Sequence, residues 1–321
     1  MINFCTLFDS NYIDRGLLMY DSLEKNCKSF HLYIFAFDDL SFDVLKKLNL
    51  KHATIISLRD LEDKDLLKAK SNRSKVEYMW TCSSSVILYI LNNYKVPSCT
   101  YIDADLFFYS DPKILIDEMG GDSVLISEHR YTKKYDQSKI SGKYCVQFMT
   151  FKRNENGLRA LNWWRNACID WCYAKPEDGK FGDQKYLDDW TERFKGVHVL
   201  ENLGGGVAPW NMHQYSFSGD NTLTEKSTSK KFEMVFFHFH AIKLFSDKVD
   251  LCPYYLPKDF LDTLYFPYVK SLLAVRERLK GIYKSLFEDK IVPKASLKAL
   301  IINIKRRLMS EYNIFGIDYF R

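Results

Sequence analysis

The segment TYIDADLFFYSDP, at residues 100–112, decides both the fold and the chemistry that we expect of this chain. It contains the end of an apolar run typical of a buried strand, which we place at 99–103, and it continues into a second apolar run. Asp103 and Asp105 lie between the two runs. Burying two carboxylates this close together is costly unless a partner compensates their charge. A divalent cation such as Mg²⁺ or Mn²⁺ is a simple partner, because these ions prefer oxygen ligands. Helix capping with a structural salt bridge is the alternative.

Another Asp-x-Asp pair, the first in chain order, occurs within the sequence LEDKDLL. Its members are Asp63 and Asp65, and their neighbours are charged residues rather than a hydrophobic strand. A pattern this short has little meaning without its context. We therefore predict that this first pair, Asp63 and Asp65, is the solvated face of a helix, and we call Asp103 and Asp105 the second pair.

Strand-like and helix-like runs alternate on both sides of the central segment. Further strands are predicted at 2–8, 30–37, 53–58, 122–127 and 144–151, and helices at 12–25, 41–49 and 74–93. This alternation is typical of an α/β fold with a mostly parallel sheet. Ligands of such sheets bind beyond the carboxyl ends of the strands, which is where Asp9, Asp103 and Asp105 fall.

The second half of the chain is less regular. It holds a Trp-rich helix near 155–174, the turn-rich GGGVAPWN at 204–211 and a strand that ends in FFHFH at 236–240. From residue 258 onward the chain is predicted to be helical and basic. We therefore divide it into a domain at 1–257 and a helical, basic C-terminal extension at 258–321. Within the extension, KASLKALIINIKRRL (294–308) is amphipathic. It is either a packed helix with a solvated face or an attachment to an anionic membrane surface.

The composition is that of a globular protein. The 321 residues are 46% hydrophobic, 16% aromatic and 27% charged, which allows a sizeable core. No stretch approaches the roughly 18 consecutive apolar residues of a membrane span. The start of the chain is not predicted to be a signal peptide, and the net charge of +5 does not indicate binding to nucleic acid. The eight cysteines lack the spacing of a zinc site, so we expect reduced thiols in a cytoplasmic protein.

The segment FFHFHAIKLF (236–245) carries two histidines that alternate with aromatic residues. His238 and His240 are either hydrogen-bonded core residues or ligands, because a neutral imidazole nitrogen can complete a metal site. The ammonium group of Lys243 follows closely and could hold a diphosphate.

Two more segments carry polar residues where a ligand could bind. In FGDQKYLDDW (181–190), Asp183 and Gln184 either cap a helix or hydrogen-bond to sugar hydroxyls. In TLFDSNYIDRG (6–16), the ring of Tyr12 is either part of the core or a platform for a flat base.

Over roughly residues 1–245, the order and spacing of these segments resemble the GT-A glycosyltransferases that use nucleotide sugars. The resemblance is greatest to glycosyltransferase family 8 and related bacterial surface-polysaccharide enzymes. It implies a Rossmann-like mixed sheet flanked by helices, followed by the helical extension.

The most specific part of the resemblance is YIDADLFFYSDP, because the family carries its metal-binding Asp-x-Asp at the corresponding strand end. The resemblance thus implies a metal site made of Asp103, Asp105 and a histidine. HFHAIKLF is similar to the family's H-F-x-G-x-x-K-P-W motif and places that histidine at His238, with His240 as the rival. Ala241 stands where the family usually has glycine.

The resemblance also implies residues for the nucleotide donor. TLFDSNY resembles the first strand and turn that hold the base, and RSKVEYMW (73–80) resembles the helix that sends Lys75, or Arg73, to the diphosphate. Lys243 lies one residue early for the family's phosphate-binding lysine. The implied cofactor-binding set is Thr6, Asp9, Tyr12, Lys75, Asp103, Ala104 and Lys243.

Further implied residues surround the sugars. The family's Asp-Gln pair, which touches the donor sugar, corresponds to Asp183 and Gln184, and these are the candidates for a protein nucleophile if one exists. APWN resembles the segment that shapes the acceptor side, hence Trp210 and Asn211. The family's Asn-Ala-Gly on a strand is replaced here by Cys-Val-Gln at 145–147, which leaves the identity of the donor sugar open.

The implied function is a metal-dependent transfer, with Mn²⁺ or Mg²⁺, from a nucleotide-diphosphate sugar such as a UDP-sugar. The implied acceptor is a saccharide or lipid-linked saccharide, as in lipopolysaccharide, O-antigen or capsule, and the implied stereochemistry is retention. Peripheral contact with the inner face of the membrane, through the basic C-terminal helices, would place the enzyme near such acceptors. The alternatives are a catalytically degenerate nucleotide-sugar or polysaccharide binding protein, and a phosphatase.

Overall fold

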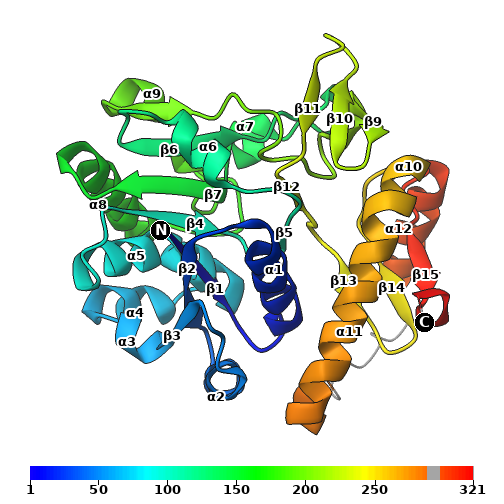
Figure 1. Ribbon diagram of the computed structural model, residues 1–321, viewed down its shortest axis with the longest axis horizontal. Coiled ribbons are helices and arrows are strands. Elements are labelled where there is room, and N and C mark those ends of the chain that lie inside the picture. The colour runs from blue at the N-terminus through cyan, green and yellow to red at the C-terminus, as the bar shows by residue number, and fades with distance from the viewer. Residues whose placement is uncertain (288–296, 321) are drawn as a thin grey trace.

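The computed structural model describes residues 1–287 and 297–320. Its centre is a seven-stranded sheet with the strand order β3-β2-β1-β4-β7-β6-β8 (Figure 1). These strands are β1 (Ile2–Phe8), β2 (Phe30–Ala36), β3 (Ala53–Ser57), β4 (Ser98–Ile102), β6 (Val124–Glu128), β7 (Tyr144–Lys152) and β8 (Val197–Val199). β7 runs antiparallel to β4 and β6, and the other neighbouring pairs are parallel. The predicted α/β class with a mixed sheet is confirmed.

Helices cover both faces of this sheet. The α-helices of the described residues are α1 (Ile13–Asn26), α2 (Asp39–Leu48), α3 (Leu58–Leu61), α4 (Lys64–Lys70), α5 (Lys75–Asn93), α6 (Lys113–Glu118), α7 (Ser138–Ser141), α8 (Glu155–Asp170), α9 (Trp190–Arg193), α10 (Lys258–Phe260), α11 (Phe266–Ile282) and α12 (Leu297–Leu308), of which the last three belong to the C-terminal extension. Successive residues of a strand point to opposite faces, so β1 sends Phe4 and Phe8 to the core under α1, and Cys5 and Leu7 to the core under α5. Burial on both faces explains why β1 and β2 read as continuous apolar runs.

Three small sheets complete the fold. β5 (Leu106–Phe108) pairs with β12 (Phe236–His238). β10 (Thr222–Glu225) lies between β9 (Tyr215–Gly219) and β11 (Lys231–Glu233), and β14 (Lys248–Asp250) lies between β13 (Lys243–Leu244) and β15 (Ile314–Gly316). The β5–β12 pair is antiparallel, and it sets His238 opposite Leu106. The predicted strand at 236–240 therefore ends two residues early, at His238.

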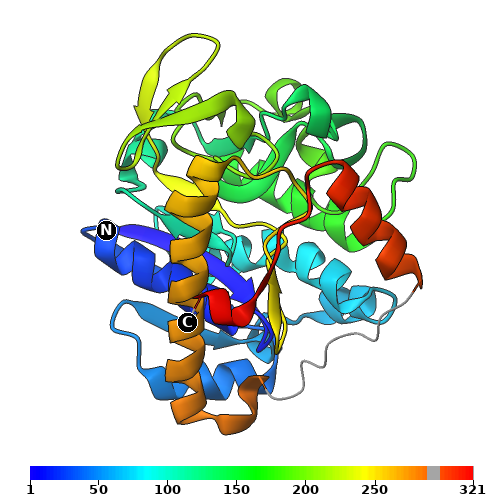
Figure 2. The ribbon, with the colours of Figure 1, turned by 90° about the vertical axis from the view of Figure 1, so that its right-hand side faces the viewer.

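The C-terminal extension packs directly onto the rest of the molecule. α11 packs across α1, and the same cluster of buried apolar residues runs from β1 into α11 (Figure 2). The ring of Tyr268 in α11 stacks on Phe239, just after β12, with 3.7 Å between ring centroids and 10° between ring planes. The domain boundary at 257/258 stays a prediction. Of the amphipathic run predicted at 294–308, residues 297–308 form α12, and 294–296 lie outside the described residues.

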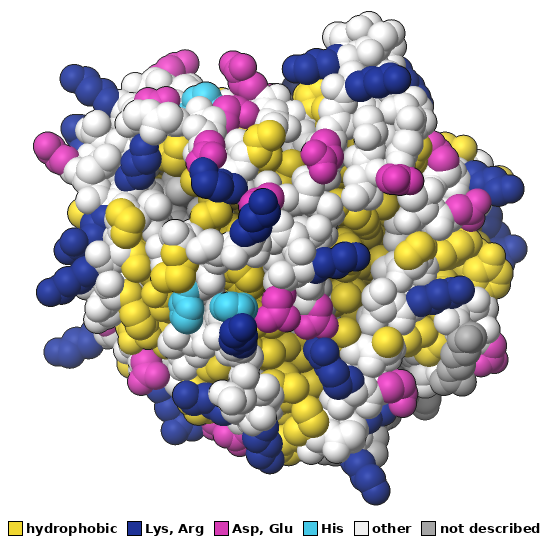
Figure 3. All heavy atoms as spheres, viewed as in Figure 1, with side chains coloured by type: hydrophobic (Ala, Val, Ile, Leu, Met, Phe, Trp, Pro, Cys, Tyr) yellow, Lys and Arg dark blue, Asp and Glu magenta, His cyan; other side chains and the backbone are white. Residues whose placement is uncertain are grey.

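The described part of the chain contains no helix that is both long and apolar enough to cross a bilayer. On the face shown in Figure 3, Lys and Arg side chains lie interspersed with Asp and Glu rather than in a patch of one sign. All eight cysteines are free thiols in the interior.

Candidate active site

The two carboxylates of the central segment lie in the short connection between β4 and β5. The backbone N–H of Asp103 donates to the carbonyl of Gln147 in β7 at 3.0 Å, which fixes the start of this connection. The hydroxyl of Tyr101 donates to Asp103 Oδ1 at 3.0 Å. Asp105 is buried, with 8% of the residue exposed. The carboxyl end of β4 thus carries an acidic group inside the protein, as the sequence predicted.

His238 comes to these carboxylates from the end of β12. Its Nε2 lies 3.0 Å from Asp105 Oδ1 and 3.9 Å from Asp103 Oδ2. Its Nδ1 lies 2.8 Å from Gln147 Oε1. Because an amide oxygen only accepts hydrogen bonds, Nδ1 is the donor to Gln147, and a neutral ring presents the Nε2 lone pair to the carboxylates.

The close approach of these groups shifts their pKa values. Burial raises the pKa of Asp103 to about 7. Burial also opposes ionisation of Asp105, but the imidazole of His238 lowers the pKa of that carboxyl to about 2. In turn Asp105 raises the pKa of His238 well above its usual value, against the effect of burial. In the absence of a cation, a protonated imidazole therefore compensates the buried charge of Asp105.

The side chains present fit a divalent cation. Single donor atoms of Asp105, His238 and His240 lie within 4.8 Å of one another, which is a separation that one ion can span. Carboxylate oxygens and imidazole nitrogens are the ligands that Mn²⁺ and related ions accept. Gln147 Nε2 is buried and has no hydrogen-bond partner among the described residues. A hydrogen-bond donor beside this cluster is therefore left for a ligand.

A second polar corner lies at the carboxyl ends of β1 and β2. Lys75, the first residue of α5, places its Nζ 2.5 Å from Asp9 Oδ2 and 3.6 Å from Asp38 Oδ2. Asp9 also accepts from the backbone N–H of Tyr12 at 3.2 Å. About half of the Lys75 side chain is exposed, so its ammonium can reach a ligand at this edge. The structure thus brings together three of the residues that the resemblance assigned to the donor, Asp9, Tyr12 and Lys75.

Tyr12 links this corner to the acidic cluster. Burial first, and then the charge of Asp105, raise the pKa of Tyr12 to about 12. The guanidinium of Arg15 lies 4.5 Å from the centroid of the Tyr12 ring. Arg15 is itself buried, donates to the carbonyl of Ile242 at 2.7 Å and pairs with Asp14 at 2.9 Å. Sequence reasoning missed Arg15, because a lone basic residue near a helix start carries no signal of burial.

The other residues predicted to bind the nucleotide donor differ in their solvent exposure. Thr6 is fully buried in β1, and its hydroxyl has no partner among the described residues. Ala104 is buried between the two carboxylates, whereas Lys243 is exposed at the start of β13. Arg73, the alternative to Lys75, turns away from the corner and stacks on Tyr173 at 3.8 Å. Lys75 is therefore the better candidate of the two.

Asp183 and Gln184 follow Gly182, which has a φ of +54°. Asp183 is buried, and burial raises its pKa to about 7. Burial, followed by the charges of Asp103 and Asp183, raises the pKa of Tyr101, so both carboxyls act on that one phenol. Asp183 of the predicted Asp-Gln pair thus lies near Tyr101, whose hydroxyl donates to Asp103.

Trp210 and Asn211 serve the fold of their own loop. Asn211 is fully buried, and its Nδ2 donates to the carbonyls of His129 and Gly206, both at 2.8 Å. Trp210 Nε1 donates to the same carbonyl of His129 at 2.9 Å. The Trp210 ring lies 5.3 Å from the ring of His238 and 5.5 Å from that of His240, measured between centroids. Trp210 thus supports the histidines, and the assignment of these two residues to the acceptor side stays a prediction.

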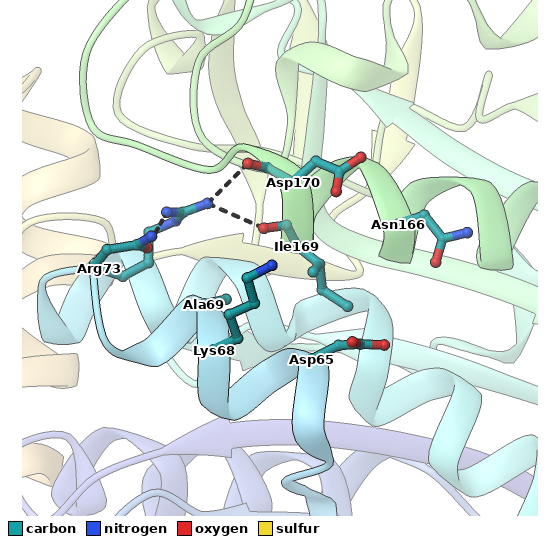
Figure 4. A pocket seen from close by; sticks show the side chains of 8 residues that line it. Asp65, Lys68, Ala69, Arg73, Asn166, Ile169 and Asp170 are labelled. Atoms are coloured by element: carbon teal, nitrogen blue, oxygen red, sulfur yellow. Dashed lines mark hydrogen bonds between the residues drawn. The ribbon is translucent and has the colours of Figure 1, made fainter.

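A separate polar cavity of about 480 Å³ lies between α4 and α8, away from the acidic cluster (Figure 4). Arg73 borders it and donates to the carbonyls of Ile169 at 3.2 Å and Asp170 at 3.4 Å. Asp65 of the first Asp-x-Asp pair also lines it (Figure 4). None of the residues that line this cavity belongs to the acidic cluster.

Comparison with known proteins identifies relatives over nearly the whole chain. The chain is 29% identical to the uncharacterized protein YfnD of Bacillus subtilis (strain 168) over 303 residues, which is 91% of this chain and 95% of YfnD. It is 31% identical to the uncharacterized protein YfnF of the same organism over 252 residues, 76% of this chain and 82% of YfnF. The chain belongs to the same protein family as YfnF. No profile of a known protein family matches the chain.

Solved structures show the fold. The galactosyltransferase LgtC, solved in complex with donor and acceptor sugar analogs, matches 91% of this chain and 98% of its own chain, with a TM-score of 0.51 and 14% identity. The bifunctional glycosyltransferase WbbM, solved in its apo form, matches 86% of this chain and 51% of its own, with a TM-score of 0.52 and 12% identity. The chain therefore has the GT-A fold of these glycosyltransferases, as the sequence predicted.

Proposed function

We propose that this protein is a cation-dependent glycosyltransferase that moves a sugar from a nucleotide-diphosphate donor to a saccharide acceptor. The observation that carries the proposal is the convergence of Asp103, Asp105 and His238 at the carboxyl end of β4. This is the edge at which α/β sheets bind their ligands. The GT-A fold, and the polar corner formed by Asp9 and Lys75 at the same edge, support it.

Each group of the site has a role in this proposal. A bound Mn²⁺ or Mg²⁺ would supply the positive charge that stabilises a leaving diphosphate. Asp103, Asp105 and His238 would hold the ion, with the ring of His238 oriented by Gln147. Lys75 would exchange its contact with Asp9 for a phosphate oxygen and add a second positive charge at the leaving group.

The finer parts of the proposal follow the resemblance. The donor is a UDP-sugar, the acceptor is a saccharide or lipid-linked saccharide of a bacterial surface polysaccharide, and the transfer retains the anomeric configuration. Asp183 and Gln184 face the donor sugar. Because burial raises the pKa of Asp183, its carboxyl can be neutral near pH 7 and donate a hydrogen bond to a sugar oxygen.

A thermal-shift screen of nucleotide sugars, with and without Mn²⁺, tests the proposal. A ligand that binds only the folded state stabilises it by about 2.7 kcal/mol at one hundred times its dissociation constant. We expect UDP-sugars to raise the midpoint of unfolding when Mn²⁺ is present and to have little effect after EDTA. The proposal fails if no UDP-, GDP- or CMP-sugar gives a cation-dependent shift.

Turnover separates an enzyme from a binding protein. The donor that gives the largest shift should release its nucleoside diphosphate when a saccharide acceptor is added, which a coupled assay detects. Donor binding without any release of nucleoside diphosphate, over a panel of lipid-linked and free saccharides, would instead indicate the degenerate binding protein.

We further propose that α12 attaches this cytoplasmic enzyme to the inner face of the membrane. The described side chains of α12 expose a stripe of large apolar residues at helical spacing: Leu300, Ile301, Ile304 and Leu308. Lys305 and Arg307 are exposed beside it. The opposite side of the helix is fixed, because Arg306 donates to both carboxylate oxygens of Asp250 at 2.7 Å. An apolar stripe with flanking cations suits an anionic lipid surface, near a lipid-linked acceptor.

Sedimentation with lipid vesicles tests this attachment. Ile304→Asp should reduce binding to vesicles that contain phosphatidylglycerol by tenfold or more, since it places an anion in the stripe. Ile114→Asp in α6 is the matched control, because Ile114 is 54% exposed and Ile304 is 51% exposed. Equal binding of the two variants, or equal binding of the unchanged protein to purely zwitterionic vesicles, would contradict the attachment.

A further inference from the structure

His240 lies beside the acidic cluster although it is outside β12. The strand ends at His238, and the backbone N–H of His240 donates to the carbonyl of His238 at 2.8 Å, so the chain turns sharply at Phe239. The two imidazole rings lie 5.7 Å apart between centroids, at 87° to each other. Asp105, His238 and His240 each offer one potential metal-ligand atom, and these three atoms lie within 4.8 Å of one another.

The turn that presents His240 is held from three sides. The N–H of Phe239 donates to the carbonyl of Asp105 at 2.9 Å, and the ring of Phe239 stacks on Tyr268. The N–H of His238 donates to Val207 at 2.9 Å. Trp210 lies against both imidazole rings. The position of His240 therefore follows from packing and backbone hydrogen bonds, although the residue is exposed.

We infer that His240 is an additional ligand of the cation, beyond Asp103, Asp105 and His238, and that it makes the site selective for Mn²⁺ over Mg²⁺. The inference rests on the proposed function, which supplies the cation. Two imidazoles change the chemistry of the site, because Mg²⁺ prefers oxygen ligands and keeps several waters, whereas imidazole suits transition metals. Gln147 supports this donor set by fixing the ring of its first histidine through Nδ1.

Binding of the metal alone tests the inference, without any need for donor, acceptor or turnover. Free Mn²⁺ is counted by electron paramagnetic resonance in titrations of the full chain, and Mg²⁺ binding is measured by its competition with Mn²⁺. We expect His240→Ala to weaken Mn²⁺ about tenfold or more, since even residues that only support metal ligands change affinity by 10- to 100-fold. Mg²⁺ affinity should change far less.

A second variant exchanges the ligand chemistry at the same position. His240→Asp replaces the nitrogen ligand with oxygen, so it should lower the ratio of Mn²⁺ to Mg²⁺ affinity while keeping a bound ion. The matched control is His198→Ala. His198 also faces carboxylates, with Glu118 Oε1 at 2.8 Å and Asp122 Oδ2 at 3.6 Å, but it lies outside the cluster. Its removal should leave both affinities unchanged.

The outcomes separate this inference from the proposed function. Unchanged Mn²⁺ affinity in His240→Ala, with normal binding by the unchanged protein, overturns the role of His240 and leaves the cation site in place. A fall in Mn²⁺ and Mg²⁺ affinity by the same factor overturns the selectivity. If the unchanged protein binds neither ion, the cation site fails altogether, and the proposed function fails with it.

Discussion

The two Asp-x-Asp pairs of this chain have opposite surroundings. Asp63 caps α4 by accepting from the backbone N–H groups of Asp65 and Leu66, and more than half of its side chain is exposed. Asp103 and Asp105 connect two strands, and Asp105 lies inside the protein against His238. The same three-residue pattern is a helix cap in one place and a candidate cation site in the other.

The difference between the pairs comes from what the fold brings to them. At the second pair, β12 arrives from a distant part of the chain and pairs with β5, which delivers His238 and the turn to His240. At the first pair, the charged partner is Arg165 of α8, which forms an ion pair with Asp63 near the surface. A guanidinium neutralises a carboxylate and offers no ligand to a metal. The meaning of the pattern is thus set by its distant partner.

The largest expected effect is at Asp105. Asp105→Asn keeps the size of the side chain and removes its charge, so we expect Mn²⁺ affinity and donor turnover to fall at least about 100-fold. Paramagnetic titration of Mn²⁺ and an assay for released nucleoside diphosphate measure the two quantities. Asp65→Asn is the control at the first pair and should change neither. Equal losses in the two variants would remove the distinction between the pairs.

Removal of the cation is the second way to test the comparison. At Mn²⁺ concentrations about one hundred times the dissociation constant, the unchanged protein should gain about 2.7 kcal/mol in free energy of unfolding, and EDTA should abolish the gain. Denaturant titrations with and without Mn²⁺ measure it. Asp63→Ala should keep the whole gain, and Asp105→Asn should lose it. A gain that survives in Asp105→Asn would place the ion elsewhere.

A smaller effect is expected at the first pair itself. Asp63→Ala removes the side chain that satisfies two N–H groups at the start of α4, so the free energy of unfolding should fall by about 1 kcal/mol. Urea denaturation measures the change. Donor turnover and Mn²⁺ affinity should stay as they are, because α4 lies away from the acidic cluster. A loss of Mn²⁺ affinity would show that this pair has more than a capping role.

Much of the central sheet could be predicted from the sequence, since β1 and β2 are buried on both faces and therefore read as apolar runs. β5 could not be predicted as a separate strand, because Leu106–Phe108 is three residues long and its partner is β12. The strands β9 and β10 were missed for a related reason. They mix polar and apolar residues at a hairpin whose exposure is known only after folding.

In the site, Asp103, Asp105 and His238 were predicted together, and the structure places them together. Gln147 was noticed as a departure from the resembled family, but its contact with His238 depends on the pairing of β7 with β4. Arg15 had no signal at all, because its surroundings include Ile242 and Tyr268 of α11, which are far along the chain. Sequence thus indicates the groups that perform the chemistry better than the groups that hold them.

The smallest expected effect concerns Ala241, in the turn that follows His240 beside the second pair. Ala241 has a φ of +67°, in the left-handed region that costs residues with a Cβ about 1–2 kcal/mol. Ala241→Gly removes this strain, while the greater freedom of glycine in the unfolded chain offsets about 0.5–1 kcal/mol. We therefore expect a net rise of about 0.5 kcal/mol in the free energy of unfolding, measured by urea denaturation.

An alanine-to-glycine substitution in α4, the helix that Asp63 caps, should change the free energy of unfolding in the opposite direction. Ala69 lies within α4, where glycine costs about 1 kcal/mol relative to alanine, so Ala69→Gly should lower the free energy of unfolding. If Ala241→Gly destabilises the protein as much as Ala69→Gly does, the left-handed turn after His240 is not the strained element that the backbone indicates. His240 would still be positioned by the backbone hydrogen bonds and ring packing of its turn, because neither depends on strain at Ala241.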